Sequence, residues 1–312
     1  MIKRASAFAP ATVANVGVGF DIMGFALSAP GEIVTVERTI DARTVVINPI
    51  ADFPELPLDP ARNTATAGLV RLLEDRKAGF GLRVTLQKQI PVGSGMGGSA
   101  ASAAAAIVAA AALMKKKLSD EELFEYAMIG EEVASGSRHG DNIAPCLFGG
   151  LTYVRSMRPA RWTKIKTPST LRCVVILPRL SVNTKAARKL LSPHVALPKV
   201  IEQSGNLAGF ILGCIKSDMK LIGESLRDVM IEPQRAQLIP GFFELQKTAL
   251  ELGALGCSIS GSGPAVFALV SGPAVARKLQ RAWSLQAEQM PLAIHDIWVS
   301  PIAGRGARLV RR

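Results

Sequence analysis

The residues best suited to chemistry lie in one short segment built mostly of small side chains, Pro91-Val92-Gly93-Ser94-Gly95-Met96-Gly97-Gly98-Ser99-Ala100-Ala101. Glycines let backbone N–H groups converge on a ligand. A helix that begins near Ser99 adds unpaired N–H groups and the positive end of its dipole. The segment therefore predicts a phosphate-binding loop, and a flexible turn ahead of a core helix is the alternative when the segment is taken alone.

The kind of phosphate loop can be narrowed by comparison with known patterns. Gly93, Gly95 and Gly98 satisfy the dinucleotide-binding spacing. That pattern also needs an acid about 20 residues further on, after a second strand, whereas Asp120 opens another helix. The chain has no G-x-x-x-x-G-K-[ST] segment and none of the V-A-I-K, H-R-D and D-F-G companions of protein kinases. With the dinucleotide, P-loop and protein-kinase patterns excluded, the segment predicts a nucleoside-triphosphate site of another kind.

Three ordered segments together resemble the GHMP small-molecule kinases: the phosphate loop, residues 9–21 and residues 258–264. Shorter matches over 137–145, 183–188 and 231–235 resemble the branch of that family that acts on homoserine, rather than its mevalonate or galactose relatives. Two positions depart from the pattern. Gly98 stands where the family usually has a serine, and Gly140 stands where that branch usually has an alanine.

The resemblance implies an α+β fold with two domains and the active site between them. Residues 1–160 would form an ATP-binding domain like domain 2 of ribosomal protein S5, and residues 161–312 would form a ferredoxin-like domain. The implied activity is transfer of the γ-phosphoryl group of ATP to the hydroxyl of L-homoserine, which gives O-phospho-L-homoserine and ADP on the route to threonine. ATP and Mg²⁺ would be the cofactors, with Gly261 contributing to the nucleotide site beside the phosphate loop.

L-homoserine carries an ammonium, a carboxylate and a hydroxyl, so its pocket needs an anion, a cation and a group that orients the hydroxyl. By the resemblance, Asn15 and Asp21 would lie near the amine and the hydroxyl, while His139, Arg188 and Arg235 would hold the carboxylate. Arginine suits that role because its planar fork can bond a carboxylate through two N–H groups. Taken singly, a helix cap, a loop histidine and surface arginines are the alternatives.

Phosphoryl transfer depends mostly on positioning and charge neutralisation, so a magnesium ion on the phosphates is expected. Ser99 and Glu131 match the positions that the family uses as metal ligands and catalytic groups, and Thr184 is a candidate to orient the γ-phosphate. No general base is assigned. His139 and Asp141 are the nearest titratable residues, but a metaphosphate-like transition state makes early removal of the proton less necessary.

The composition excludes several classes of protein. The chain has 312 residues, of which 48% are apolar and 20% charged, which argues against disorder, fibres and coiled coils. Four cysteines lie tens of residues apart, so reduced thiols and a cytoplasmic location are the expectation. Glycine and proline break the two long uncharged runs, 89–114 and 252–276, and polar residues interrupt any signal peptide. No membrane span is predicted.

The two halves of the chain differ in charge. Residues 1–155 hold 15 basic and 16 acidic side chains, and residues 156–312 hold 22 and 9. The asymmetry supports a domain boundary, and a well-solvated basic surface explains it better than nucleic-acid binding because no aromatic interleaving accompanies it. The expected partners are therefore small molecules, with no nucleic acid and no membrane, and a homodimer stays open. A kinase of another small alcohol, a non-catalytic relative and a nucleic-acid-binding protein are the alternative functions.

Residue patterns predict mixed strands and helices in both halves. Expected strands cover 33–36, 44–47, 81–86, 171–177, 265–270 and 293–299. Expected helices cover 63–75, 99–114, a capping-box helix from about 119 to 135, several segments between 184 and 252, and 274–286. Residues 155–170 are expected to cross between the domains, and 305–312 to be a solvated tail.

Overall fold

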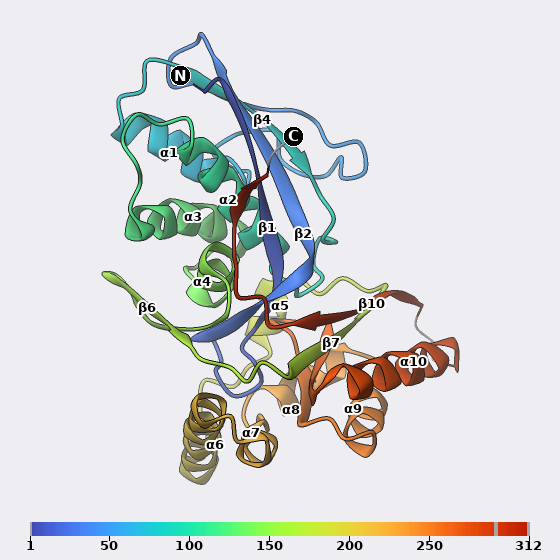
Figure 1. Cartoon of the computed structure of the whole chain (residues 1–312). Helices are drawn as coiled ribbons and strands as arrows, with labels where there is room; N and C mark the ends of the chain where they lie inside the picture. The colour runs from blue at the N-terminus through green and yellow to red at the C-terminus, as the bar shows by residue number, and fades with distance from the viewer. Residues whose placement is uncertain (1, 290–292, 311–312) are drawn as a thin grey trace.

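Two β-sheets organise the chain in the computed structural model, which describes residues 2–289 and 293–310 (Figure 1). The seven-stranded sheet contains β1 (Arg4–Ala14), β2 (Met23–Thr39), β3 (Val45–Ile47), β4 (Gly81–Gln87), β5 (Leu151–Met157), β6 (Ala160–Ile165) and β11 (Arg308–Val310). The four-stranded sheet contains β7 (Leu171–Pro178), β8 (Gly256–Ile259), β9 (Val266–Ser271) and β10 (Ile294–Pro301).

Helices from the first half of the chain lie on one side of the larger sheet (Figure 1). They are α1 (Ala67–Asp75), α2 (Gly98–Ala111), α3 (Asp120–Ser135) and α4 (Gly140–Phe148). Helix α2 is rich in alanine and is buried along most of its length. Because alanine side chains are small, α2 packs closely against β1 and β2, which places its first turn and the loop before it at the end of the sheet.

Helix α3 begins and ends where its sequence predicts. The Ser119 hydroxyl accepts a hydrogen bond from the Glu122 backbone N–H at 3.2 Å, and the Glu122 carboxylate accepts one from the Ser119 N–H at 2.9 Å. Gly136 ends the helix with a φ of 76°, in the left-handed region that suits glycine. These caps set the length of α3, which carries Glu131 toward the start of α2.

The smaller sheet has the order β10-β7-β9-β8, with every neighbouring pair antiparallel. Its chain order of strand, helices, two strands, helix and strand gives the ferredoxin-like arrangement. The helices of this half are α5 (Thr184–Lys189), α6 (Leu197–Lys216), α7 (Met219–Ser225), α8 (Glu232–Arg235), α9 (Phe242–Glu251) and α10 (Pro273–Gln289). Trp283 of α10 is fully buried and donates to the Leu245 carbonyl at 3.0 Å, which ties α10 to α9.

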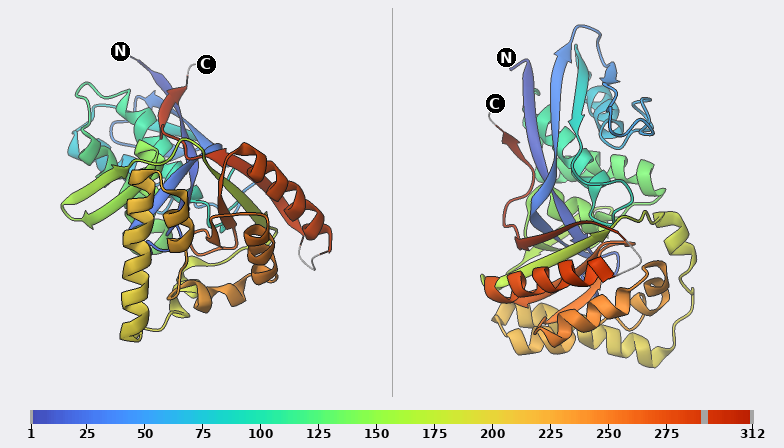
Figure 2. Two further views of the ribbon diagram at one scale, coloured as in Figure 1. Left: turned by 60° about the horizontal axis from the view of Figure 1, so that its bottom comes forward. Right: turned by 90° about the vertical axis from the view of Figure 1, so that its right-hand side faces the viewer.

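Two segments that were expected to be a crossing and a tail form strands. Residues 155–165 belong to the β5–β6 hairpin, and the chain changes sheet only between Ile165 and Leu171. Exposed charged residues in both strands hide the alternation on which a strand prediction depends. Within 305–312, Arg308–Val310 forms β11 beside β1 (Figure 2), with the Arg308 guanidinium 4.5 Å from the centre of the Phe8 ring. Residues 311–312 lie outside the described residues.

Two exclusions made from the sequence can be compared with the structure. Cys146, Cys173, Cys214 and Cys257 are all buried and none forms a disulfide, as predicted. Among the described residues, no helix combines the length and the apolar character that crossing a bilayer requires.

Candidate active site

A cleft of about 490 Å³ opens beside the phosphate loop, and residues that follow strands of both sheets line it. It gathers most of the predicted site residues: Asn15, Asp21, Pro91, Val92, Gly93, Ser94, Gly95, Gly97, Gly98, Ser99, Glu131, His139, Thr184, Arg188, Arg235 and Gly261. Met96, Ala100 and Ala101 are fully buried behind the loop, in the core. They shape the loop from behind.

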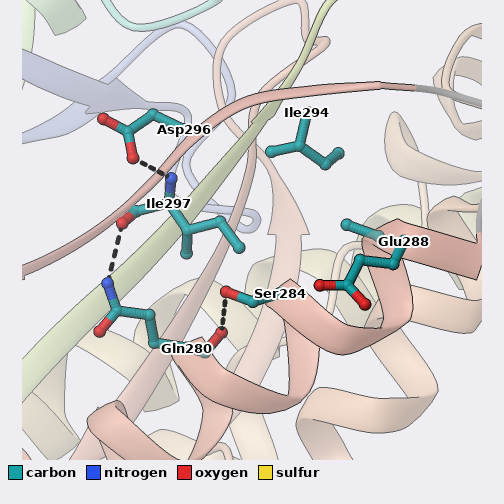
Figure 3. A pocket seen from close by; sticks show the side chains of 7 residues that line it. Gln280, Ser284, Glu288, Ile294, Asp296 and Ile297 are labelled. Carbon is teal, nitrogen blue, oxygen red and sulfur yellow. Dashed lines mark hydrogen bonds between the residues drawn. The ribbon is translucent and has the colours of Figure 1, made fainter.

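A second pocket, of about 450 Å³, lies between α10 and β10 (Figure 3). Gln280 donates to the Ile297 carbonyl at 3.0 Å, and the Ser284 hydroxyl donates to the Gln280 carbonyl at 3.0 Å. The described residues that line it include two acidic side chains, Glu288 and Asp296, and no basic one. An anionic nucleotide therefore fits this pocket poorly, and the cleft at the phosphate loop is the candidate active site.

The phosphate loop is held between the other two segments singled out in the sequence. Gly95 and Gly97 have φ angles of 76° and 68°, which glycine adopts readily. A Cβ on Gly95 would lie 2.5 Å from the Ser260 carbonyl oxygen, and one on Gly97 would lie 2.1 Å from the Thr12 hydroxyl. The Ser260 hydroxyl donates to the Gly95 carbonyl at 2.8 Å. Residues 9–21, 91–101 and 258–264 thus form one packed unit.

The start of α2 offers an anion site at this loop. Gly97 is the N-cap and supplies no side-chain hydrogen bond, and the first turn of α2 contains no acidic residue. The N–H groups of that turn and the positive end of the helix dipole are therefore available to a phosphate.

Ser99 and Glu131 meet at the edge of the cleft. The Ser99 hydroxyl donates to a carboxylate oxygen of Glu131 at 3.0 Å, and the Glu131 side chain is nearly buried. Mg²⁺ prefers oxygen ligands and in nucleotide sites takes one or two from the protein, with waters and phosphates completing its shell. A hydroxyl and a carboxylate that face the phosphate loop fit this ion.

A charge cluster occupies the other end of the cleft. One terminal nitrogen of Arg188, Nη2, lies 2.7 Å from both carboxylate oxygens of Asp21 and 2.9 Å from His139 Nε2. The Asn15 side chain accepts from the Asp21 backbone N–H at 3.0 Å and donates to the Gly261 carbonyl at 2.9 Å. Asn15 thereby fixes the loop that carries Asp21 against the 258–264 segment.

A second arginine lies beside the first. Arg235 is 3% exposed, and its Nη1 donates to the Gly261 carbonyl at 3.0 Å. The guanidinium carbons of Arg188 and Arg235 lie 5.3 and 5.1 Å from the centre of the Phe20 ring. Burial, and then the charge of Arg188, lower the pKa of Arg235. The Nε atoms of both arginines are buried and lack a protein partner, so this end of the cleft suits a carboxylate.

His139 and Asp141 lie where α4 begins. The pKa of His139 is lowered, mainly by burial. The charges of Arg188 and Arg235 lower it further, and the charge of Asp21 opposes them. Asp141 is 3% exposed and its Oδ1 has no partner. Burial first, then the charges of Asp21 and Glu131, raise the pKa of Asp141 to about 8.

Some residues of the cleft were not assigned a role from the sequence. The sequence identifies Asp141 only as a titratable neighbour, includes Asn142 and Ser262 in matching segments without a role, and gives no indication for Lys88. Asn142 accepts from the Thr12 hydroxyl at 2.6 Å, and the Ser262 hydroxyl lies 3.3 Å from that of Thr184. An acid in the first turn of a helix that follows a glycine is the one signal that could have pointed to Asp141.

We expect Asp141 to make the folded protein less stable as the pH rises. Its pKa of about 8 lies above the value of about 3.9 for an aspartate in an unfolded chain, so between these values the folded state holds a proton that the unfolded state has lost. The contribution of Asp141 to the stability of the folded protein is therefore fully present below about pH 4 and is lost as the pH rises toward 8. Asp141→Asn should raise the melting temperature relative to the wild type by several degrees more at pH 8 than at pH 5, at about 2–4 °C per kcal/mol.

The matched control for this prediction is Asp41→Asn, which removes an exposed carboxylate far from the cleft in sequence. Melting temperatures are measured from pH 5 to pH 8. A constant difference between Asp141→Asn and the wild type over this range would show that the pKa of Asp141 is not raised.

The two departures from the family pattern have different surroundings. A Cβ on Gly140 would lie 2.9 Å from Phe124 Cζ and 3.0 Å from Met157 Sδ, so these side chains fill the space that an alanine would need. A Cβ on Gly98 would lie 3.2 Å from Ile90 Cγ2 and 3.4 Å from Lys88 Nζ. Gly140 is thus explained by packing, and Gly98 places the phosphate loop next to a lysine.

Comparison with known proteins agrees with this arrangement. The model of the GHMP kinases N terminal domain matches residues 63–150, and that of the GHMP kinases C terminal matches residues 210–289. Homoserine kinase of Chloroherpeton thalassium is 40% identical over 99% of this chain and 100% of its own length. Homoserine kinase of Xylella fastidiosa is 42% identical over 98% of this chain and 94% of its own.

A solved structure extends the likeness to the whole fold. The crystal structure of homoserine kinase from Cytophaga hutchinsonii superimposes with a TM-score of 0.95 at 40% identity, covering 99% of this chain and 98% of the other. The family explains the two-sheet fold and the packed phosphate loop. The chain belongs to the GHMP kinase family of ATP-dependent small-molecule kinases and groups with its homoserine kinases.

Proposed function

We propose that this protein transfers the γ-phosphoryl group of ATP to the hydroxyl of L-homoserine, giving O-phospho-L-homoserine and ADP, a step of threonine biosynthesis. The observation that carries the proposal is the charge cluster beside the phosphate loop. It presents a carboxylate, Asp21, and two arginines with unpaired N–H groups, Arg188 and Arg235, within one cleft. An α-amino acid with a side-chain hydroxyl is the substrate that these charges complement.

In this proposal each end of the substrate has its own partners. Asp21 receives the ammonium, and Asn15 keeps the Asp21 loop in place and lies near the amine and hydroxyl. Arg188 and Arg235, with His139, hold the carboxylate. Before substrate binds, Arg188 and Asp21 form an ion pair, with Arg188 Nη2 2.7 Å from Asp21 Oδ2. A zwitterion can replace this ion pair with two new ones, whereas a neutral alcohol cannot.

The nucleotide lies on the phosphate loop, residues 91–101, with Gly261 at the far side. Ser99 and Glu131 would hold Mg²⁺, which would supply positive charge beside the phosphates. Thr184, whose hydroxyl lies 3.3 Å from that of Ser262, orients the γ-phosphate. These groups act by positioning and by electrostatics, which suits a reaction in which the transferred group carries spread negative charge.

The fate of the hydroxyl proton involves no strong base. The raised pKa of Asp141, about 8, keeps this carboxyl largely protonated at neutral pH in the unliganded protein, and the lowered pKa of His139 keeps the imidazole neutral. The phosphate itself can accept the proton late in the reaction. This assignment leaves Asp141 as a buried neutral group at the start of α4.

The remaining proposals concern the setting of the reaction. Four buried free thiols support a cytoplasmic location. The change of sheet between Ile165 and Leu171 supports two domains, with a boundary a few residues after the 1–160 and 161–312 division expected from the sequence, and β11 returns to the larger sheet. Small molecules are the proposed partners, with no nucleic acid and no membrane, and a homodimer is compatible with this function.

The experiment that tests the function is an ADP-release assay with L-homoserine, mevalonate, galactose and shikimate as acceptors. We expect kcat/KM for L-homoserine to exceed that for each other alcohol by at least about 100-fold, because only it can replace both charges of the Asp21–Arg188 pair. ADP release without an acceptor gives the background. A different alcohol with the highest kcat/KM would contradict the proposal while leaving the kinase assignment intact.

A further inference from the structure

A buried ion pair, Lys88–Glu32, lies beside Gly98 of the phosphate loop. Lys88, just after β4, donates to a carboxylate oxygen of Glu32 on the neighbouring strand β2 at 3.1 Å. The Lys88 side chain is 5% exposed and that of Glu32 is 0% exposed. Removing two charges from water is costly, and such a pair is often no more stabilising than apolar residues of the same size. Stability alone is therefore a weak reason for this pair.

The geometry of Glu32 orients the lysine. The carboxylate oxygen that receives the Lys88 ammonium also accepts the Ile90 backbone N–H at 3.2 Å, and the second oxygen is buried with no partner. The Phe53 ring centre lies 5.9 Å from the Lys88 ammonium nitrogen on another side. Glu32 thus holds the ammonium at one position rather than letting it extend into solvent.

That position adjoins the first residue of α2. Lys88 lines the cleft, and its ammonium nitrogen lies 3.4 Å from the point that a Cβ on Gly98 would occupy. Gly98 has no side chain, so nothing of its own stands between the ammonium and the N–H groups at the start of α2. An ammonium has three donors, of which the Glu32 contact uses one.

We infer that Lys88 is a nucleotide-binding residue whose ammonium contacts the phosphate chain of bound ATP or ADP, and that Glu32 is the positioning residue that holds it beside Gly98. The inference rests on the ATP-dependent activity of the family. Lys88 would supply a full positive charge to the phosphates, in addition to the helix dipole and the loop N–H groups. Lys88 would act on nucleotide affinity and not on L-homoserine.

The test compares Lys88→Met with the double variant Glu32→Gln/Lys88→Met. The single variant leaves Glu32 buried without its partner and can lose stability for that reason alone, whereas the double variant replaces the ion pair with two neutral side chains of similar size. Binding of ADP and of adenosine, each by displacement of a fluorescent nucleotide, separates phosphate contacts from nucleoside contacts. Thermal melting shows that the variants are folded.

In the double variant we expect ADP affinity to fall about tenfold or more, because a charge-assisted hydrogen bond is lost, while adenosine affinity changes less than about twofold. KM for ATP should rise and KM for L-homoserine should not. Lys116→Met, at an exposed lysine, controls for the general loss of one positive charge.

Two results would overturn the inference. Unchanged ADP affinity in the folded double variant would make the pair purely structural. Equal losses for ADP and adenosine would place Lys88 at the nucleoside or in the fold of the cleft. Neither result depends on turnover of L-homoserine, so a wild-type protein that used another alcohol would still give a clear answer about Lys88.

Discussion

Arg235→Met should lower kcat/KM for L-homoserine roughly 30-fold to several thousand-fold, a loss of about 2–5 kcal/mol in transition-state stabilisation, and Arg188→Lys should lower it less. Much of that loss comes from leaving the substrate carboxylate unpaired in a desolvated pocket. Arg235 is the more buried of the two, so its loss should cost more. Arg188→Lys keeps the charge, but it loses the planar fork and should still be clearly impaired.

The specificity of this loss is what identifies a carboxylate partner. The variants should lose activity toward L-homoserine far more than toward an uncharged four-carbon alcohol, measured as kcat/KM for both acceptors. Arg277→Lys, at an exposed position on α10, is the matched control and should behave as the wild type. Equal proportional losses for the two alcohols would mean that the arginines are structural and that another group holds the carboxylate.

The elements that carry the phosphate loop were predictable because local patterns specify them. Ser119 and Glu122 form a capping box, and the structure contains it with helix α3 ending at Gly136. Apolar periodicity, and the glycines and prolines that bound each element, also predicted the glycine-rich loop, α2 and the strands β4, β7, β9 and β10. The joint occurrence of three segments pointed to the family, and the structure packs those segments together through Gly95, Gly97 and Ser260.

What could not be predicted depends on contacts between distant residues. Strands β6 and β11 are largely exposed and carry charged residues, so pairing with β5 and β1 rather than composition makes them strands. In the sequence, Asp141 is an ordinary acidic residue in the first turn of a helix. Its raised pKa comes from burial and from the charges of Asp21 and Glu131, which only the fold brings near. Lys88 and Glu32 are 56 residues apart and carry no sequence sign that they form a pair.

The proposed roles of the site residues are still predictions, including the assignment of Ser99 and Glu131 to Mg²⁺. Their hydroxyl and carboxylate meet at 3.0 Å beside the phosphate loop, which is the observation that favours a shared ion. Glu131 supplies the charged ligand and Ser99 a neutral one, so the two substitutions should differ in size of effect.

Glu131→Gln should lower kcat by about 100- to 1,000-fold, since it removes a ligand to an ion that neutralises charge developing in the transition state. The Mg²⁺ concentration that gives half-maximal rate should rise, and KM for L-homoserine should change little. Ser99→Ala should act in the same direction with a smaller loss. The measurement is steady-state kinetics of each variant across a magnesium titration.

Glu132→Gln is the matched control, because Glu132 is the next residue on α3 and its side chain is 50% exposed, turned about 100° around the helix from Glu131. Near-normal rates for Glu131→Gln with an unchanged magnesium dependence would show that the ion is held by phosphates and water alone.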